Sequence, residues 1–161
     1  MGIEYTGEHT LFQGIGIFFV YLSFCAAIAS SLSYLLSIKD SSWKNLGRIF
    51  FKIHTLAVVG IVSMMFIMLF NAWYEFSYVW EHRNNAMPLK YILSCFWEGQ
   101  EGSFLLWTFW NIILGNILIR TAKNWEPEVM ANFSLVQVFL SSMLLGVYIL
   151  DYKMGSNPFI L

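Results

Sequence analysis

The chain has 161 residues, of which 58% are hydrophobic and 12% are charged, and its net charge is −1. Soluble domains carry about 25% charged residues, so this composition excludes an ordinary water-soluble protein and predicts an integral membrane protein in contact with lipid. The near-neutral charge gives no electrostatic reason to expect nucleic acid or acidic lipids as partners. Cys25 and Cys95 form neither a CxxC pair nor a metal-binding pattern, so we predict two ordinary thiols and no metal ligands.

Four apolar stretches predict an all-α membrane protein with four transmembrane helices in a single domain, 1–161. A helix needs about 20 apolar residues to cross roughly 30 Å of hydrocarbon. The stretches cover about 11–38, 49–70, 103–120 and 129–150. The first is too long for a signal peptide and has no basic flank before it, so we expect it to stay in the mature protein.

The basic residues predict the orientation. Six of them fall in or beside the first and third connections, and three fall elsewhere. The positive-inside rule therefore places these two connections in the cytoplasm and puts both termini and the connection 71–102 outside. The six residues are Lys39, Lys44, Arg48, Lys52, Arg120 and Lys123.

The connection 71–102 is rich in aromatic residues and is the most distinctive segment. Its first part, 71–80, has the composition of an amphipathic helix in the outer membrane interface. Asn84, Asn85 and Pro88 then predict a turn.

The end of this connection, WEGQEGS, has two interpretations. Glu101 lies near the start of the third helix, where the helix dipole favours negative charge, so the segment reads as a capped helix start. The alternative is an external contact surface formed by Trp97, Gln100, Glu101 and Gly102, where glycine lets a partner approach the backbone.

The histidines suggest one further site. His54 lies about a turn and a half inside the cytoplasmic end of the second helix. An ionisable residue in the membrane is a functional candidate, and neutral imidazole is a good haem ligand. A single histidine near a helix end is more often a hydrogen-bonded packing residue. We predict no catalytic residues, because the sequence contains no Ser/His/Asp set, phosphate loop or CxxCH motif.

Three segments carry a resemblance to a known family. They are SYVWEH at 77–82, PLKYILSCFWEGQEGSFLLW at 88–107, and GSNPF at 155–159. Their sequence and order resemble the amino-terminal portion of the CcmF/NrfE haem lyase family of cytochrome c-type biogenesis proteins. This chain departs from the pattern at Glu98, where many members have glycine.

The resemblance implies a role in attaching haem covalently to apocytochrome c in the bacterial inner membrane, where the distribution of basic residues places both termini in the periplasm. Family members carry haem b, receive haem from a CcmE-like chaperone and act with a CcmH-like subunit. Their haem-ligating histidines and tryptophan-rich WWD segment lie beyond the part matched here. We therefore expect this chain to be a fragment, a split-gene product or a short form that binds no haem alone and works with the remainder of the lyase.

Two other functions also fit the sequence. The chain could be a small structural or transporter-type subunit of a membrane complex, or a haem-handling protein of the CcsA type. A continuing reading frame with a WWD segment downstream of Leu161 would favour the lyase, whereas an unrelated transporter operon would favour the first alternative.

Overall fold

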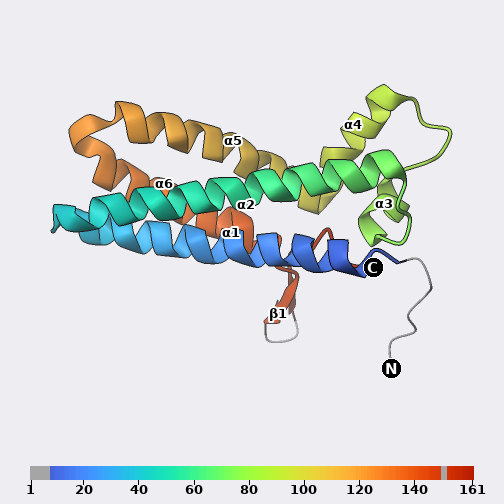
Figure 1. The fold of residues 1–161 in the computed structure, drawn as a ribbon, viewed down its shortest axis with the longest axis horizontal. Coiled ribbons are helices and arrows are strands. Elements are labelled where there is room, and N and C mark those ends of the chain that lie inside the picture. The colour runs from blue at the N-terminus through green and yellow to red at the C-terminus, as the bar shows by residue number, and fades with distance from the viewer. Residues whose placement is uncertain (1–7, 150–151) are drawn as a thin grey trace.

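The computed structural model describes residues 8–149 and 152–161, and most of these residues are helical (Figure 1). Residues 1–7 of the predicted domain lie outside the described residues. The α-helices are α1 (Thr10–Ser37), α2 (Lys44–Asn71), α3 (Ser77–His82), α4 (Leu89–Glu98), α5 (Gln100–Thr121) and α6 (Glu126–Ser142). Two 3₁₀ turns, η1 (Ser41–Trp43) and η2 (Lys123–Trp125), precede α2 and α6.

Three helices in the described part of the chain are long and apolar enough to cross a membrane. They are α1, α2 together with η1, and α5, which correspond to the predicted stretches 11–38, 49–70 and 103–120. The second helix begins five residues before the predicted start, at Lys44. A long apolar run allows few alternatives to a buried or membrane-spanning helix, which explains the agreement.

The fourth predicted helix, 129–150, is wrong at its carboxyl end. α6 ends at Ser142, and an antiparallel hairpin of β1 (Val147–Ile149) and β2 (Tyr152–Met154) follows; residue 150 lies outside the described part. Gly146 and Gly155 border the hairpin with φ angles of 64° and 65°, a conformation that favours glycine. Valine, tyrosine and isoleucine suit a strand as well as an apolar helix, so hydropathy alone did not reveal the change.

The segment 71–102 also contains more regular structure than an aromatic-rich loop. Ala72 ends α2 with a left-handed φ of 57°, and α3 and α4 follow before α5. The helix expected over 71–80 begins later, at Ser77. The predicted turn is confirmed, since the Met87 amide donates to the Asn84 carbonyl oxygen at 3.1 Å.

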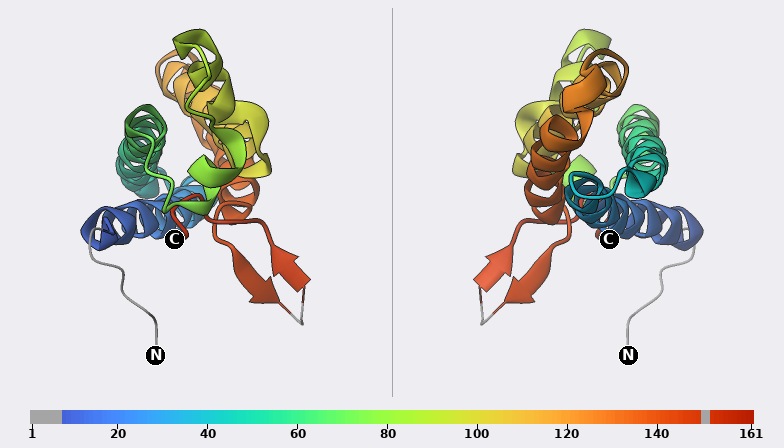
Figure 2. Two further views of the ribbon diagram at one scale, coloured as in Figure 1. Left: turned by 90° about the vertical axis from the view of Figure 1, so that its right-hand side faces the viewer. Right: turned by 90° about the vertical axis from the view of Figure 1, so that its left-hand side faces the viewer.

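α1 lies between α2 and α6, and α5 packs against both α6 and α2 (Figure 2). The face of α1 that makes these contacts carries small buried residues, which let the helix backbones approach closely. They include Ser23, Ala26, Ala27 and Ser30. The connections α1–α2 and α5–α6 lie at one end of the bundle, whereas α3 and α4 lie at the other (Figure 1).

An ion pair joins the two connections at their end of the bundle. Arg48 on α2 donates from Nε and Nη2 to the two carboxylate oxygens of Glu126, each at 2.6 Å. Lys44 adds a contact of 2.9 Å, and the Tyr34 hydroxyl on α1 donates to the same carboxylate at 3.3 Å. The Glu126 side chain is only 1% exposed, so this set of contacts holds α1, α2 and the start of α6 together.

Candidate functional site

The elbow between α4 and α5 is an ordered turn. Gly99 separates the two helices with an extended backbone, at φ −82° and ψ 167°. The Ser103 amide donates to the Gly99 carbonyl oxygen at 3.0 Å, and the Ser103 hydroxyl donates to the Trp97 carbonyl oxygen at 2.8 Å. These bonds satisfy backbone groups that a helix terminus otherwise leaves unpaired.

The glycines of the elbow are needed for packing against α3. A Cβ atom at Gly99 would lie 2.7 Å from the Tyr78 ring and 2.8 Å from Nε2 of His82. The Tyr78 hydroxyl lies 2.9 Å from the carbonyl oxygens of both Cys95 and Phe96. Burial raises the pKa of Tyr78, so this hydroxyl keeps its proton and serves as a donor to the backbone at the end of α4.

The carboxyl-terminal segment 155–161 docks against the same end of the bundle. The Phe159 ring is fully buried and packs directly against Gly16. A Cβ atom added at Gly16 would lie only 2.4 Å from this ring. The Phe159 amide donates to Oδ1 of Asn157 at 3.0 Å, and the Ser77 amide donates to the Ile160 carbonyl oxygen at 3.0 Å. Segment 155–161 is therefore tied to both α1 and α3.

These elements together enclose a polar cavity of about 220 Å³. α3 contributes Ser77, Tyr78 and Glu81, α5 contributes Glu101, and the carboxyl-terminal segment contributes Ser156, Asn157 and Ile160. Two carboxylates face a space lined by hydroxyl and amide groups, an arrangement that can accept hydrogen bonds from a cationic or donor-rich group. All three segments that carry the family resemblance contribute to this cavity, although they lie far apart in sequence.

The four residues of the predicted contact surface divide between different environments. Trp97 is 46% exposed and Gln100 is also exposed, whereas Glu101 is half-buried and lines the polar cavity. Gly102 is buried: a Cβ there would lie 1.7 Å from the Phe96 carbonyl oxygen. Gly102 therefore shapes the elbow from within and offers little surface to a partner.

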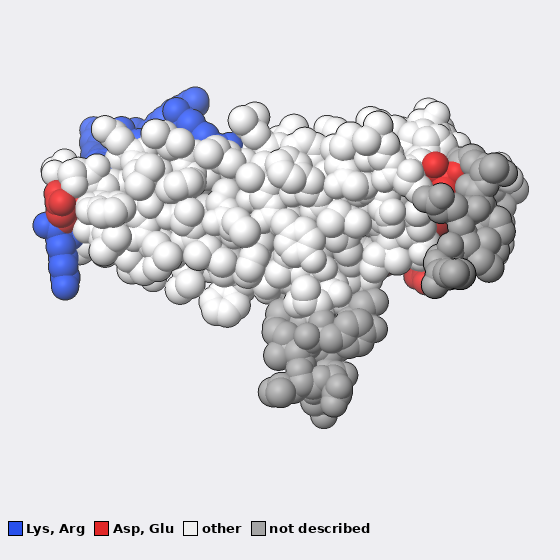
Figure 3. All heavy atoms as spheres, turned by 60° about the horizontal axis from the view of Figure 1, so that its bottom comes forward, with Lys and Arg blue, Asp and Glu red and all other residues white. Residues whose placement is uncertain are grey.

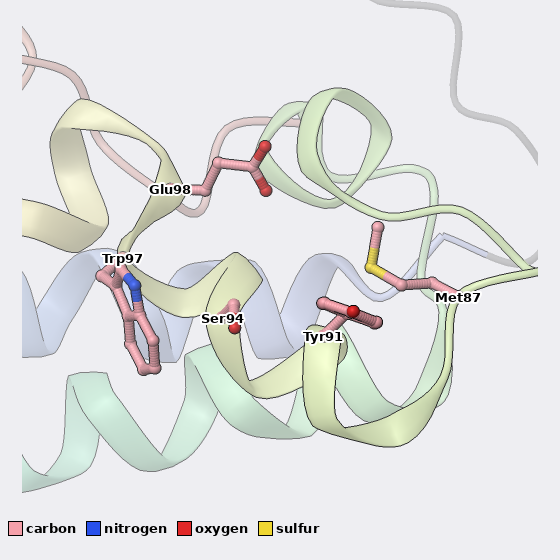
Figure 4. Close-up of a pocket in the computed structure, with 5 residues that line it drawn as sticks. All are labelled: Met87, Tyr91, Ser94, Trp97 and Glu98. Carbon is pink, nitrogen blue, oxygen red and sulfur yellow. The ribbon is translucent and has the colours of Figure 1, made fainter.

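Trp97 lines a second hollow, of about 410 Å³, along one side of α4 (Figure 4). Met87, Tyr91, Ser94 and Glu98 complete its lining. Figure 4 shows the Trp97 ring and the Glu98 carboxylate leaving α4 in different directions. Trp97 therefore lies next to an aromatic face of α4. Hydropathy had predicted a loop where the structure has α4.

The three histidines lie in packed, hydrogen-bonded positions. His54 lies ten residues after the start of α2, which is about 15 Å along the helix and deeper than predicted. It is fully buried, and its Nδ1 donates to the Ser23 carbonyl oxygen at 2.9 Å. His82 stacks on Tyr78 and bonds its carbonyl oxygen, while His9 stacks on Trp73 and pairs with Glu75.

His54 instead belongs to a polar group in the centre of the bundle. Gln137 on α6 is fully buried near the imidazole, and its Nε2 lies 3.5 Å from the Thr108 carbonyl oxygen on α5. Nε2 of His54 and Oε1 of Gln137 have no hydrogen-bond partner among the described residues. Together with Ser23 on α1, this group contains one residue from each long helix. Sequence reasoning identified His54 but missed Gln137 and Thr108, because their meeting depends on how the helices pack.

The sequence matches no protein-family model. A cytochrome c-type biogenesis protein, CycK, of Bradyrhizobium diazoefficiens is 27% identical over 106 residues, which are 65% of this chain and 16% of that protein. The solved structure of the cytochrome c haem lyase CcmF matches with a TM-score of 0.82 and 18% identity, over 99% of this chain and 26% of that one. The chain thus spans about a quarter or less of these relatives, and it has a CcmF-like fold.

Proposed function

We propose that this chain forms the amino-terminal part of a CcmF-like haem lyase and contributes to cytochrome c maturation in the bacterial inner membrane. The observation that carries the proposal is the convergence of residues 77–82, 88–107 and 155–159 on one polar cavity. These segments were singled out by sequence resemblance alone, and the CcmF-like fold extends over 99% of the chain. The proposed role in cytochrome c maturation follows from the two relatives, which are a cytochrome c-type biogenesis protein and a cytochrome c haem lyase.

The charge distribution supports an orientation with the polar cavity in the periplasm. Lys and Arg side chains gather at the end of the bundle that holds the α1–α2 and α5–α6 connections, and the middle of the face in Figure 3 is uncharged. By the positive-inside rule this end is cytoplasmic, so α3, α4 and segment 155–161 face the periplasm. α6 has 17 residues, about 25 Å, and we propose that it forms a fourth, slightly short span that begins after Glu126.

In this proposal the exposed elbow residues Trp97 and Gln100, together with Glu101, contact a periplasmic partner. The partner is a CcmE-like haem chaperone, a CcmH-like subunit, apocytochrome c or the remainder of the lyase. Trp97 supports a contact role because large aromatic side chains dominate binding energy at interfaces. Haem b belongs to the complete lyase, and this chain's own histidines are used in packing.

The test is complementation of a strain that lacks the gene, with the rest of the maturation system intact. Trp97→Ala, Gln100→Ala and Glu101→Gln should lower the yield of haem-stained cytochrome c while each variant still accumulates in the membrane. Glu128→Gln removes one carboxylate at the opposite end of the bundle, where Glu128 is exposed, and serves as the matched control. Normal cytochrome c yield in all three elbow variants would reject the contact surface. Normal yield in the gene deletion itself would reject the proposed function and favour a structural subunit of another complex.

A further inference from the structure

A lateral groove of about 400 Å³ runs between α2 and α5, both of which are long and apolar enough to cross a membrane. Thr55 and Val59 on α2 line one wall; Phe109, Ile112, Ile113, Asn116, Ile117 and Arg120 on α5 line the other. From Phe109 to Arg120 the groove follows α5 for about 16 Å, since a helix rises 1.5 Å per residue. This length is close to half of the roughly 30 Å hydrocarbon thickness, which is the depth of one leaflet.

The polar side chains in the floor of the groove are already hydrogen-bonded within the protein, so the floor behaves as an apolar surface towards a bound molecule. Asn116 Nδ2 donates to Thr55 Oγ1 at 2.9 Å and to the Ile112 carbonyl oxygen at 2.8 Å. The Thr55 hydroxyl donates to the Phe51 carbonyl oxygen at 2.9 Å. A hydrocarbon chain can therefore lie along this floor without leaving a buried donor unsatisfied.

One end of the groove is lined by a cationic side chain, and a second cationic residue follows on α2 just outside the lining. Arg120 lines it from the last turn of α5, and Lys52 precedes Thr55 by three residues, so Lys52 lies one turn further along the same face of α2. Both side chains are exposed, and neither forms an ion pair with a residue that the structure describes. By contrast, Lys44 and Arg48 nearby are held by Glu126.

We propose that this groove binds one acyl chain of an anionic phospholipid, with the lipid phosphate held between Lys52 and Arg120. Basic residues at the cytoplasmic mouth of a cleft between transmembrane helices suit an acidic headgroup, and the apolar groove suits the attached chain. A groove one leaflet deep fits an acyl chain better than a further helix, which would need the full membrane thickness. The net charge of −1 gave no hint of such a site, because it averages Lys52 and Arg120 with acidic residues elsewhere in the chain. The proposal is independent of the haem lyase role.

The test uses the purified, delipidated whole chain, native mass spectrometry, and phosphatidylglycerol or phosphatidylcholine with identical acyl chains. We expect one phosphatidylglycerol to be retained at least several-fold more strongly than phosphatidylcholine. The double variant Lys52→Gln/Arg120→Gln should reduce phosphatidylglycerol retention to the phosphatidylcholine level. The control Lys39→Gln/Lys90→Gln removes the same charge away from the groove and should retain the lipid. Equal retention of both lipids, or an equal loss in the control, would overturn the proposal.

A second measurement identifies the occupant in the native membrane. A photoreactive amino acid at Ile117, inside the groove, should form an adduct with the mass of a phospholipid after illumination of whole cells. A photoreactive residue at Leu32, an exposed position on α1, reports the background of unspecific lipid contact. If Ile117 forms adducts with protein instead, the groove is an interface with another polypeptide and the lipid proposal fails.

Discussion

Gly102 and Tyr78 compete for the same space at the elbow: a Cβ atom at position 102 would lie 2.3 Å from the tyrosine hydroxyl oxygen. The same atom would lie 1.7 Å from the Phe96 carbonyl oxygen, so rotation of the tyrosine side chain alone would not relieve the clash. Gly102 therefore fixes the angle between α4 and α5, and with it the position of Glu101 in the polar cavity.

The first prediction is that Gly102→Ala destabilises the protein. Forcing extra atoms into a packed site costs about 1–3 kcal/mol, and a rigid backbone neighbour favours the upper end of that range. Thermal unfolding of the purified protein in detergent should show a clearly lower melting temperature. Gly14→Ala is the control, because the added Cβ would have no atom within 4 Å apart from its chain neighbours and the backbone of its own helix turn, and it should be neutral or stabilising by about 0.5–1 kcal/mol. Equal melting temperatures for the two variants would contradict the packing role of Gly102.

The second prediction concerns the pH dependence of the ion pair at the opposite end. Burial raises the pKa of Glu126, but hydrogen bonds and charge from Arg48 and Lys44 outweigh this effect and hold it below its ordinary value of 4.5. A carboxylate with a lowered folded-state pKa stabilises the fold above its unfolded pKa and loses that contribution as the pH falls through the folded value. Melting temperature should therefore decline below about pH 4.5 in the natural protein.

The variant Glu126→Gln isolates this contribution. It should melt at a lower temperature at neutral pH, because Arg48 and Lys44 lose their partner, and its acid-dependent decline should be shallower. Glu128→Gln changes an exposed neighbouring carboxylate and should keep the natural pH profile. If Glu126→Gln and the natural protein decline in parallel, the ion pair does not govern acid stability.

The third prediction is that the isolated chain does not bind haem through His54. Nδ1 of the fully buried imidazole donates to Ser23, and Nε2 has no hydrogen-bond partner in the described part of the chain. A haem would have to separate packed helices to reach this Nε2 atom. Titration of the purified chain with haemin should give no Soret band that depends on His54. His82→Ala serves as the comparison. A stoichiometric Soret band that disappears in His54→Ala and persists in His82→Ala would show that His54 is a ligand after all.

The fourth prediction fixes the orientation in the membrane. Alkaline phosphatase fused after Asp40 should be inactive and the same enzyme fused after Asn84 should be active, because we propose that these positions lie in the cytoplasm and the periplasm, respectively. Green fluorescent protein fusions at the two positions should give the reverse pattern. Activity of the phosphatase at Asp40 alone would invert the proposed topology.

Hydropathy predicted the three longest helices because a long apolar run leaves the backbone few other solutions in a membrane. It failed at the end of α6 because Val147 to Ile149 continue the apolar run with residues that also favour strands. The missing information was in Gly146 and Gly155, whose positive φ angles frame the hairpin.

The sequence identified the segments that form the polar cavity, but it did not show how these segments are arranged in space. The resemblance drew attention to residues 77–82, 88–107 and 155–159, yet the sequence does not show that Glu81, Glu101 and Asn157 line one cavity. Sequence also placed Gly102 on a contact surface with Trp97. Its burial depends on Tyr78, a residue 24 positions earlier in the chain, and such tertiary contacts are absent from local patterns.

The docking of Phe159 against Gly16 has a consequence for biosynthesis. Segment 155–161 leaves the ribosome after α6, the last of the helices described, so the slot on α1 is made long before its occupant is synthesised. The polar cavity therefore cannot close until segment 155–161 has been made. A chain truncated after Ser142 would contain α1 to α6 but would lack the wall of the cavity formed by Ser156, Asn157 and Ile160.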